Sequence, residues 1–219
     1  MQKLNQQPDI CPYFSPEFKV IPQYIVMKEG ECMELNNKTT NFFIFILSGE
    51  ITISFEQYTN RPVLENEMFF LPKNNCFKWK AVTKTALILT GYNTTTFPCT
   101  SARAGILYKI KGGVKFDCRG VVMKDEVKTV VNQMKHYLES GINCHHMYIL
   151  KHKELYLMFK HFYTYEEIVQ IFYLTLGSNP LFNERVLDNY LKVKTVKELA
   201  GLLGYGIKTF EKLFRENFD

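Results

Sequence analysis

The stretch FFIFILSGEITISFEQY, residues 42–58, places two runs of Phe, Ile and Thr on either side of Ser-Gly-Glu. Aromatic and β-branched residues favour extended backbone, whereas Gly and Ser mark a reversal of the chain. The stretch therefore predicts two strands joined by a hairpin turn between Leu47 and Ile51.

Further runs of the same kind follow at short intervals. EMFFLP (67–72), CFKWKAV (76–82) and TALILTGY (85–92) are separated by turn-rich segments such as YTNRP and PKNN. About seven or eight short strands with this spacing are typical of a β-sandwich or barrel. We therefore expect a β-domain in the first half of the chain.

The pattern changes beyond residue 114. In MKDEVKTVVNQMKHYLES (123–140), apolar residues recur three and four positions apart, which places them on one face of a helix. Further helices are predicted over 145–162 and 165–176. The apolar stripe of the first helix fits either self-association into a homodimer or packing within its own chain; it consists of Val127, Val130, Val131, Met134 and Leu138.

Composition bounds the class of protein. The chain has 219 residues, of which 46% are hydrophobic and 15% aromatic, and this excludes a disordered protein. The net charge of +5 is small, so nucleic-acid binding would need a local cationic patch. No apolar run reaches about 18 residues, and the N-terminus has no apolar signal core. We expect a cytoplasmic protein with no membrane contact, whose six scattered cysteines are reduced.

A second informative stretch lies near the C-terminus, TVKELAGLLGYGIKTFEKLFREN (195–217). Thr195 is a good N-cap, and Glu198 three residues later completes a capping box. Gly204 suits the left-handed position after a helix, and a new apolar periodicity begins at Phe210. Two short helices joined by a Gly-containing turn fit a helix-turn-helix.

The second of these helices is predicted to be two-faced. If Phe210, Leu213 and Phe214 are buried, its other face carries donors suited to phosphates and base edges. The alternative is an ordinary helical hairpin with a solvated charged face. The side chains predicted to point outward are Lys208, Thr209, Glu211, Lys212 and Arg215.

This segment resembles the first of the two helix-turn-helix units of AraC/XylS-type transcription regulators. The resemblance covers about forty residues, and the matching positions are Leu199, Ala200, Gly204, Tyr205, Phe210, Lys212, Phe214 and Arg215. It implies binding to double-stranded DNA, with Lys208, Glu211 and Lys212 facing base edges. Thr195 and Arg215 would lie near phosphates.

The segment departs from the family pattern in two ways. Gly206 stands where the family usually has Ser; Gly can cap a helix at a cost of a few tenths of a kcal/mol, but a hydroxyl that could meet a phosphate is lost. The family continues with a linking helix and a second helix-turn-helix, and this sequence stops at Asp219. A truncation or a shortened natural product would both give this result.

The first half resembles the cupin-like barrel that often precedes such units. Metal-dependent cupins need imidazole or carboxylate ligands, whereas the matching places hold Asn36, Lys38, Phe42 and Phe77. We therefore expect no metal, no cofactor and no enzymatic activity. The barrel would hold a small effector in an apolar pocket or would be filled by side chains; the candidate lining is Phe45, Phe55, Phe70, Phe77 and Trp79.

All histidines lie in the middle helices, and they are interpreted as surface residues because their spacing does not suit a shared metal. They are His136, His145, His146, His152 and His161.

Together these patterns predict an α+β protein in three parts: a cupin-like antiparallel β-barrel (1–113), a helical connector (114–178) and a helix-turn-helix (179–219). The predicted function is that of an AraC-type transcription regulator that responds to an effector. One alternative is a cyclic-nucleotide-receptor-like regulator, although neither Arg61 nor Arg103 has the Gly-Glu…Arg setting of that class. The other is a non-enzymatic, small-molecule-binding cupin protein.

Overall fold

The computed structural model describes residues 21–38, 40–73, 75–92, 107, 110–142, 144–176, 182, 185–186 and 189–218. The chain divides into two compact units, one formed by 1–96 and 116–163 and the other by 97–115 and 164–219. The three-part division predicted from the sequence stays a prediction. Its boundary at 178/179, Cys11 and Cys99 lie outside the described residues.

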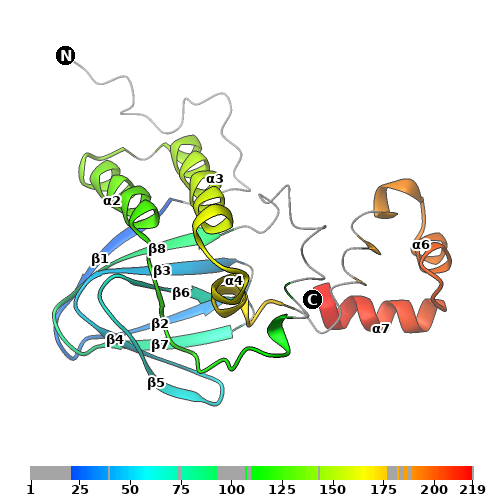
Figure 1. Cartoon of the computed structure of the whole chain (residues 1–219), viewed down its shortest axis with the longest axis horizontal. Coiled ribbons are helices and arrows are strands. Elements are labelled where there is room, and N and C mark those ends of the chain that lie inside the picture. Colours follow the sequence, from blue (N-terminus) through cyan, green and yellow to red (C-terminus); the bar gives the residue numbers. More distant parts are fainter. Residues whose placement is uncertain are drawn as a thin grey trace. The chain divides into compact units, whose positions relative to one another are not determined.

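The first unit contains two antiparallel sheets (Figure 1). One sheet has five strands in the order β1-β8-β3-β6-β9, and the other has four in the order β2-β7-β4-β5. An eight-stranded arrangement that crosses repeatedly between two such sheets is a jelly roll, with β9 added at one edge. The strands are β1 (Gln23–Met27), β2 (Cys32–Asn37), β3 (Asn41–Ser48), β4 (Ile51–Phe55), β5 (Tyr58–Val63), β6 (Glu67–Leu71), β7 (Asn75–Ala81), β8 (Thr85–Tyr92) and β9 (Val121–Val122).

The α+β class is confirmed, but the predicted closed barrel is wrong. Among the described strands, none pairs across from one sheet to the other, so β1, β9, β2 and β5 remain edge strands. The apolar alternation of the sequence predicts which residues are inside; it does not decide whether the strands close into one barrel or form two facing sheets.

The predicted hairpin at Ser-Gly-Glu is also wrong. β3 pairs with β6 and β8, whereas β4 pairs with β5 and β7, so this turn carries the chain from one sheet to the other. The reason lies in burial: residues 43–46 of β3 are all fully buried, whereas β4 has one partly exposed face. Gly49 makes the crossing with φ +82, and a Cβ there would lie 2.5 Å from the carbonyl oxygen of Lys84.

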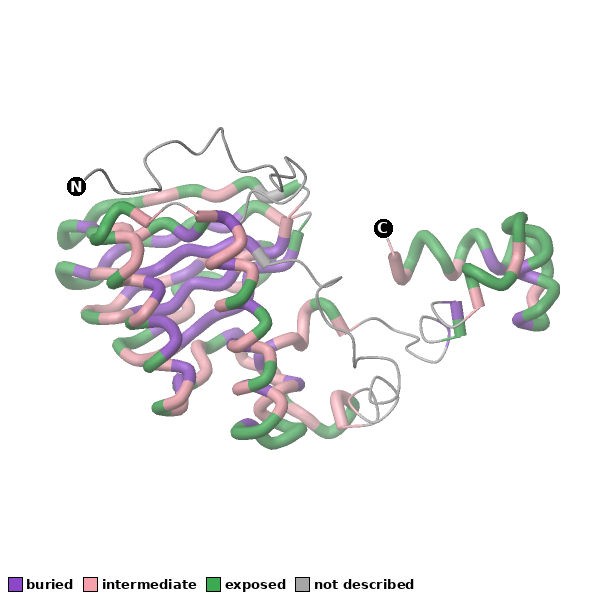
Figure 2. The backbone as a smooth tube through the Cα atoms, turned by 90° about the horizontal axis from the view of Figure 1, so that it is seen from above, coloured by how far each residue is buried: buried purple, intermediate pink, exposed green. Residues whose placement is uncertain are grey.

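Side chains pack against both faces of the five-stranded sheet. Figure 2 shows many buried residues along the strands of the first unit. Between the sheets, Phe69 of β6 meets Phe55 of β4, with ring centroids 6.4 Å apart. On the opposite face, Phe43 of β3 meets Phe159, with centroids 5.6 Å apart. Phe159 belongs to a helix, so this second face is covered by helices and not by solvent.

Two helices provide this cover, α2 (Asp125–Glu139) and α3 (His145–Phe162), and they lie next to each other over the sheet (Figure 1). The prediction of a helix over 145–162 is confirmed. The α2 stripe packs within its own chain, because Val127, Val130, Val131 and Met134 are at most 2% exposed. These four residues match the second interpretation of the stripe, Leu138 is half-buried, and the homodimer stays a prediction.

The second unit contains α4 (Tyr165–Phe172), the short 3-10 helix η4 (Tyr190–Lys192), α6 (Val196–Leu202) and α7 (Ile207–Phe218). α4 begins with a capping box formed by Thr164 and Glu167, and it ends four residues before the predicted end at 176. None of the described helices combines the length and apolar character that crossing a membrane requires.

Candidate functional site

The start of α6 is fixed by its cap. The Thr195 hydroxyl accepts a hydrogen bond from the Glu198 N–H at 3.2 Å, as the sequence predicts. The reciprocal half of the box differs from the prediction, because the Glu198 carboxylate accepts from the N–H of Lys194, at 2.9 Å, and not from that of Thr195. The helix start is therefore held by two side-chain bonds, which satisfy two backbone donors near this end.

The turn after α6 is a Schellman motif. The Tyr205 N–H donates to the Ala200 carbonyl at 2.9 Å, and the Gly204 N–H donates to the Gly201 carbonyl at 3.0 Å. Gly204 has φ +77, which confirms its predicted left-handed conformation. α7 then begins at Ile207, so the two helices are joined by only a short turn. This bonding fixes the turn without help from other parts of the chain.

A small aromatic and aliphatic core holds the two helices together. Phe182 contacts Tyr205 at 5.5 Å and Phe210 at 5.3 Å between ring centroids. Ala200, 1% exposed, is the small residue in this core. The buried members are Phe182, Val186, Leu199, Ala200, Leu203 and Phe210.

The outer face of α7 carries the predicted DNA-contacting side chains. These side chains are all exposed: Lys208, Thr209, Glu211, Lys212 and Arg215, together with Thr195 at the start of α6. Lys212 is 77% exposed and pairs weakly with Glu216 at 3.8 Å along the helix. No acidic residue lies in the first turn of α7. The face is therefore open and cationic at its N-terminal end, where the helix dipole is also positive.

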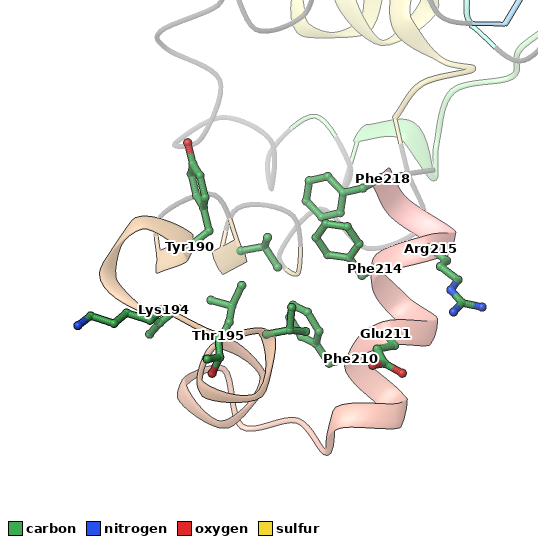
Figure 3. Close-up of a pocket in the computed structure, with 12 residues that line it drawn as sticks. Tyr190, Lys194, Thr195, Phe210, Glu211, Phe214, Arg215 and Phe218 are labelled. Carbon is green, nitrogen blue, oxygen red and sulfur yellow. The ribbon is translucent and has the colours of Figure 1, made fainter.

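The inner face of α7 differs from the prediction, because Leu213 is only partly buried and Phe214 is exposed. Phe210 is 1% exposed, but Phe214 is 36% exposed and stacks on Phe218, with centroids 4.6 Å apart. The two rings line an apolar groove of about 670 Å³ bounded by η4, α6 and α7. In Figure 3, the labelled phenylalanines point into this groove, whereas Arg215 extends from the other side of α7. The groove lining also includes Thr195, Glu211 and Arg215, so the groove and the predicted DNA-contacting face share these residues.

The predicted effector-pocket residues do not gather in one place. Phe55, Phe77 and Trp79 lie between the two sheets, and the Phe55 and Phe77 rings are 4.6 Å apart. Phe45 and Phe70 instead share the helix-covered face with Phe43, which lies 5.4 and 4.9 Å from them between centroids. All five are buried, so the sequence predicts their burial, but alternation alone cannot say which face each one occupies.

Sequence reasoning missed Arg61 as an inward-facing residue. It lies directly opposite the fully buried Ile53, so both side chains point between the sheets. Its Nε atom and the Nε1 atom of Trp79 are buried and have no hydrogen-bond partner among the described residues. The sequence does carry a signal for this orientation. Arg61 lies two residues before Val63 in a strand, so both side chains point to the same face of the sheet.

The histidines of α3 are not all surface residues, and the interpretation is corrected for His145 and His152, each 6% exposed. The Nε2 atom of His152 lies 2.8 Å from the Thr90 hydroxyl on β8. Burial, and then the neighbouring His145, lowers the pKa of His152 to about 4. Burial and His146 also lower the pKa of His145. Within the described residues, no group of three His, Cys, Asp or Glu side chains could hold a metal ion.

Comparisons with known proteins return only solved structures, since no family model and no curated protein matches the chain. The Cnp3 cupin domain of Schizosaccharomyces pombe is 22% identical over 42% of this chain and 63% of that chain, with a TM-score of 0.33. A cupin superfamily protein of Desulfitobacterium hafniense is 15% identical over 33% and 65%, with a TM-score of 0.31. A complex of FeII HppE with substrate is 15% identical over 33% and 45%, with a TM-score of 0.31.

The chain therefore spans less than two thirds of the length of these structures. The strand order of the two sheets is itself that of a jelly roll, the architecture that cupins use.

The expectation that the chain is not an enzyme is corrected here. HppE is an iron(II) protein crystallised with its substrate, so an enzyme is among the similar structures.

Proposed function

We propose that this chain is a DNA-binding transcription regulator of AraC/XylS type, in which α7 contacts double-stranded DNA and the jelly roll holds an effector. One observation carries the proposal: the rigid pair of α6 and α7 presents Lys208, Lys212 and Arg215 on one exposed face. A recognition helix needs such a face, because phosphates require cations and base edges require donors.

The support from rigidity is independent of charge. Thr195 caps α6, the Schellman bonds at Gly204 fix the turn, and the buried Phe210 anchors α7 beneath its cationic face. A side chain on a helix that is held at both its turn and its core loses little freedom when it meets DNA. A charged face on a frayed or isolated helix would lack this advantage.

The proposal assigns different tasks to two side chains. Lys212, on the middle of the outer face, faces base edges, and Arg215, one turn further along, contacts a phosphate. Lys212→Ala should weaken binding to the specific site by about 5- to 150-fold, since a good base contact contributes about 1–3 kcal/mol. Arg215→Ala should weaken binding to all sequences alike and reduce the slope of log K against log salt by about 1.

The experiment is a fluorescence anisotropy titration with duplex from the upstream region of the chain's own gene and with an unrelated duplex, at several salt concentrations. Lys80→Ala provides the matched control, because Lys80 is an exposed lysine on β7, in the jelly-roll unit. It should leave both affinities unchanged. Equal binding by wild type, Lys212→Ala and Arg215→Ala would remove this face of α7 from the DNA interface and overturn the proposal.

A further inference from the structure

One row of side chains crosses the inner face of the four-stranded sheet. Arg61 on β5 is paired with Ile53 on β4, and Ile53 is paired with Trp79 on β7. Directly opposite residues in antiparallel strands point to the same side, and Ile53 is 0% exposed. Arg61 and Trp79 therefore flank a buried apolar residue, with their Cα atoms about 10 Å apart across two strand spacings.

Both flanking side chains carry a buried donor that is not satisfied. The Arg61 Nε–H and the Trp79 Nε1–H have no acceptor among the described residues, and no described carboxylate forms an ion pair with Arg61. Trp79 is only 2% exposed. Leaving such donors without acceptors destabilises the folded chain, and a charged donor does so more than a neutral one. Nearly all buried donors in proteins have partners, so two orphans in one row need an explanation.

The surroundings offer aromatic rings, and the Asp117 carboxylate, whose charge also acts on the neighbouring Cys118 thiol, is already paired with Arg119 at 2.8 Å. Phe55 lies 4.6 Å from Phe77 and 5.3 Å from Tyr58 between ring centroids, and Tyr58 meets Phe116 edge to face at 5.8 Å. Cys118 is fully buried close by, and burial raises the pKa of its thiol to about 12 despite Arg61. The thiol is thus neutral at physiological pH and cannot balance the guanidinium.

We propose that the end of the jelly roll beside β5 binds a small organic acid. Its carboxylate pairs with the Arg61 guanidinium, and the Trp79 N–H donates to an oxygen of the ligand. Ile53 and Phe55 are 0% and 5% exposed without ligand, so the apolar body packs on them after the side chains that cover them move aside. The half-buried side chains of Arg61 and Tyr58, on the edge strand β5, place the entrance at this edge.

The chemistry of the row selects the ligand class. A guanidinium stays charged and binds carboxylates through two parallel hydrogen bonds. The indole and phenyl rings would leave a small inorganic anion without polar partners on its other sides, so an apolar body is needed. A neutral ligand would leave the Arg61 charge unbalanced. The regulatory meaning of this ligand rests on the proposed function, but its binding does not.

The test uses Trp79, the sole tryptophan in the sequence, as an internal probe. Titration with phenylacetate and with hexanoate, in the absence of DNA, should give a saturable change in tryptophan emission. The neutral amides of the same acids should bind at least about tenfold more weakly, because a hydrogen-bonded charge pair contributes about 1.5–3 kcal/mol. Inorganic phosphate should give no saturable response.

Arg61→Gln should weaken acid binding at least about tenfold, and Arg61→Lys should retain part of it; circular dichroism checks that both variants fold. The matched control is Lys78→Gln, which changes an exposed lysine next to Trp79 on the opposite face of β7. Calorimetry on Trp79→Phe should show a several-fold loss, the effect of removing one donor.

Three results would overturn the proposal: no saturable response to either acid, equal affinity for acid and amide, or unchanged binding by Arg61→Gln. Saturation by phosphate at the same strength would overturn the apolar part of the ligand assignment. A chain that binds DNA through α7 but gives none of these emission changes would refute this inference alone. A chain that binds the acids but no DNA would refute the proposed function and leave the acid site standing.

Discussion

Both units of the chain expose lysines, such as Lys80 and Lys212, but they differ in whether donor groups are also enclosed. In the jelly-roll unit, Arg61, Trp79 and His152 direct polar atoms into buried surroundings. In the C-terminal unit, Lys208 and Lys212 stand on an exposed helix face above an apolar core. Enclosed donors suit a small ligand, whereas open cations suit an extended polyanion.

Substitutions in the two hydrophobic cores should have the largest effects on stability, each confined to its own unit. Phe210 is 1% exposed and belongs to a cluster of six buried residues, so Phe210→Ala should cost about 3–5 kcal/mol and unfold α6 and α7 together. Hydrogen exchange should show lost protection in these helices with protection retained in β3. Phe43→Ala, in the core beneath α3, is the reciprocal variant and should loosen β3 while α6 and α7 keep their protection. Loss of protection throughout the chain in both variants would show one cooperative core and break the comparison.

Acid should act on the first unit selectively. His152 has a pKa of about 4 against an ordinary value of 6.5, so the unfolded chain takes up the proton first as pH falls. The stability is complete above about pH 6.5 and is lost progressively towards pH 4, by up to about 3 kcal/mol. Urea denaturation at several pH values measures this slope.

His152→Gln should reduce the dependence of stability on pH. Part of the dependence should remain because burial also lowers the pKa of His145. His161→Gln is the control, because that side chain is exposed and should leave the slope as it is. If stability depends on pH as strongly in His152→Gln as in the wild type, His152 is not a buried neutral imidazole.

Two glycines test the turn between α6 and α7 in the second unit. Gly204 has φ +77 and Gly201 lies within α6, and a Cβ at either position would meet no atom within 4 Å. Gly204→Ala should therefore cost about 1–2 kcal/mol through backbone strain alone. Gly201→Ala should stabilise by about 0.5–1 kcal/mol, since Ala is the better helix former. Thermal denaturation would contradict the Schellman turn if both substitutions shifted the midpoint in the same direction.

The smallest effect belongs to the cap of α6. Thr195→Ala removes the acceptor of the Glu198 N–H and should cost about 1 kcal/mol. Thr209→Ala, an exposed threonine on α7, should change stability by less than about 0.5 kcal/mol. If the two variants have the same denaturant midpoint, the cap hydrogen bond makes no measurable contribution to stability.

What the sequence predicts well in this chain is local. The helix over 145–162, the cap at Thr195 and the left-handed Gly204 depend on neighbouring residues, and all three are confirmed. Propensity, capping and turn chemistry act within a few positions, so one sequence carries the whole signal. The α+β class follows from the same local periods.

What the sequence misses depends on partners far along the chain. The turn at Gly49 has the residues of a hairpin, yet β3 finds its neighbours in β6 and β8. Phe45 and Phe55 both lie at alternating strand positions. The order of the strands places Phe45 on the helix-covered face of its sheet and Phe55 between the two sheets. Arg61 could not be recognised because its meaning comes from Ile53 and Trp79 beside it.

The most direct test of the central claim is lysine reactivity with and without DNA. Amine-acylating reagent and mass spectrometry report each lysine in the folded chain, and Lys208, Lys212, Lys78 and Lys80 are all exposed before DNA is added. If α7 contacts DNA, duplex from the upstream region of the chain's own gene should slow acylation of Lys208 and Lys212 several-fold and leave that of Lys78 and Lys80 unchanged. Protection of the β7 lysines with Lys208 and Lys212 still reactive would place the nucleic acid on the jelly roll and contradict the account.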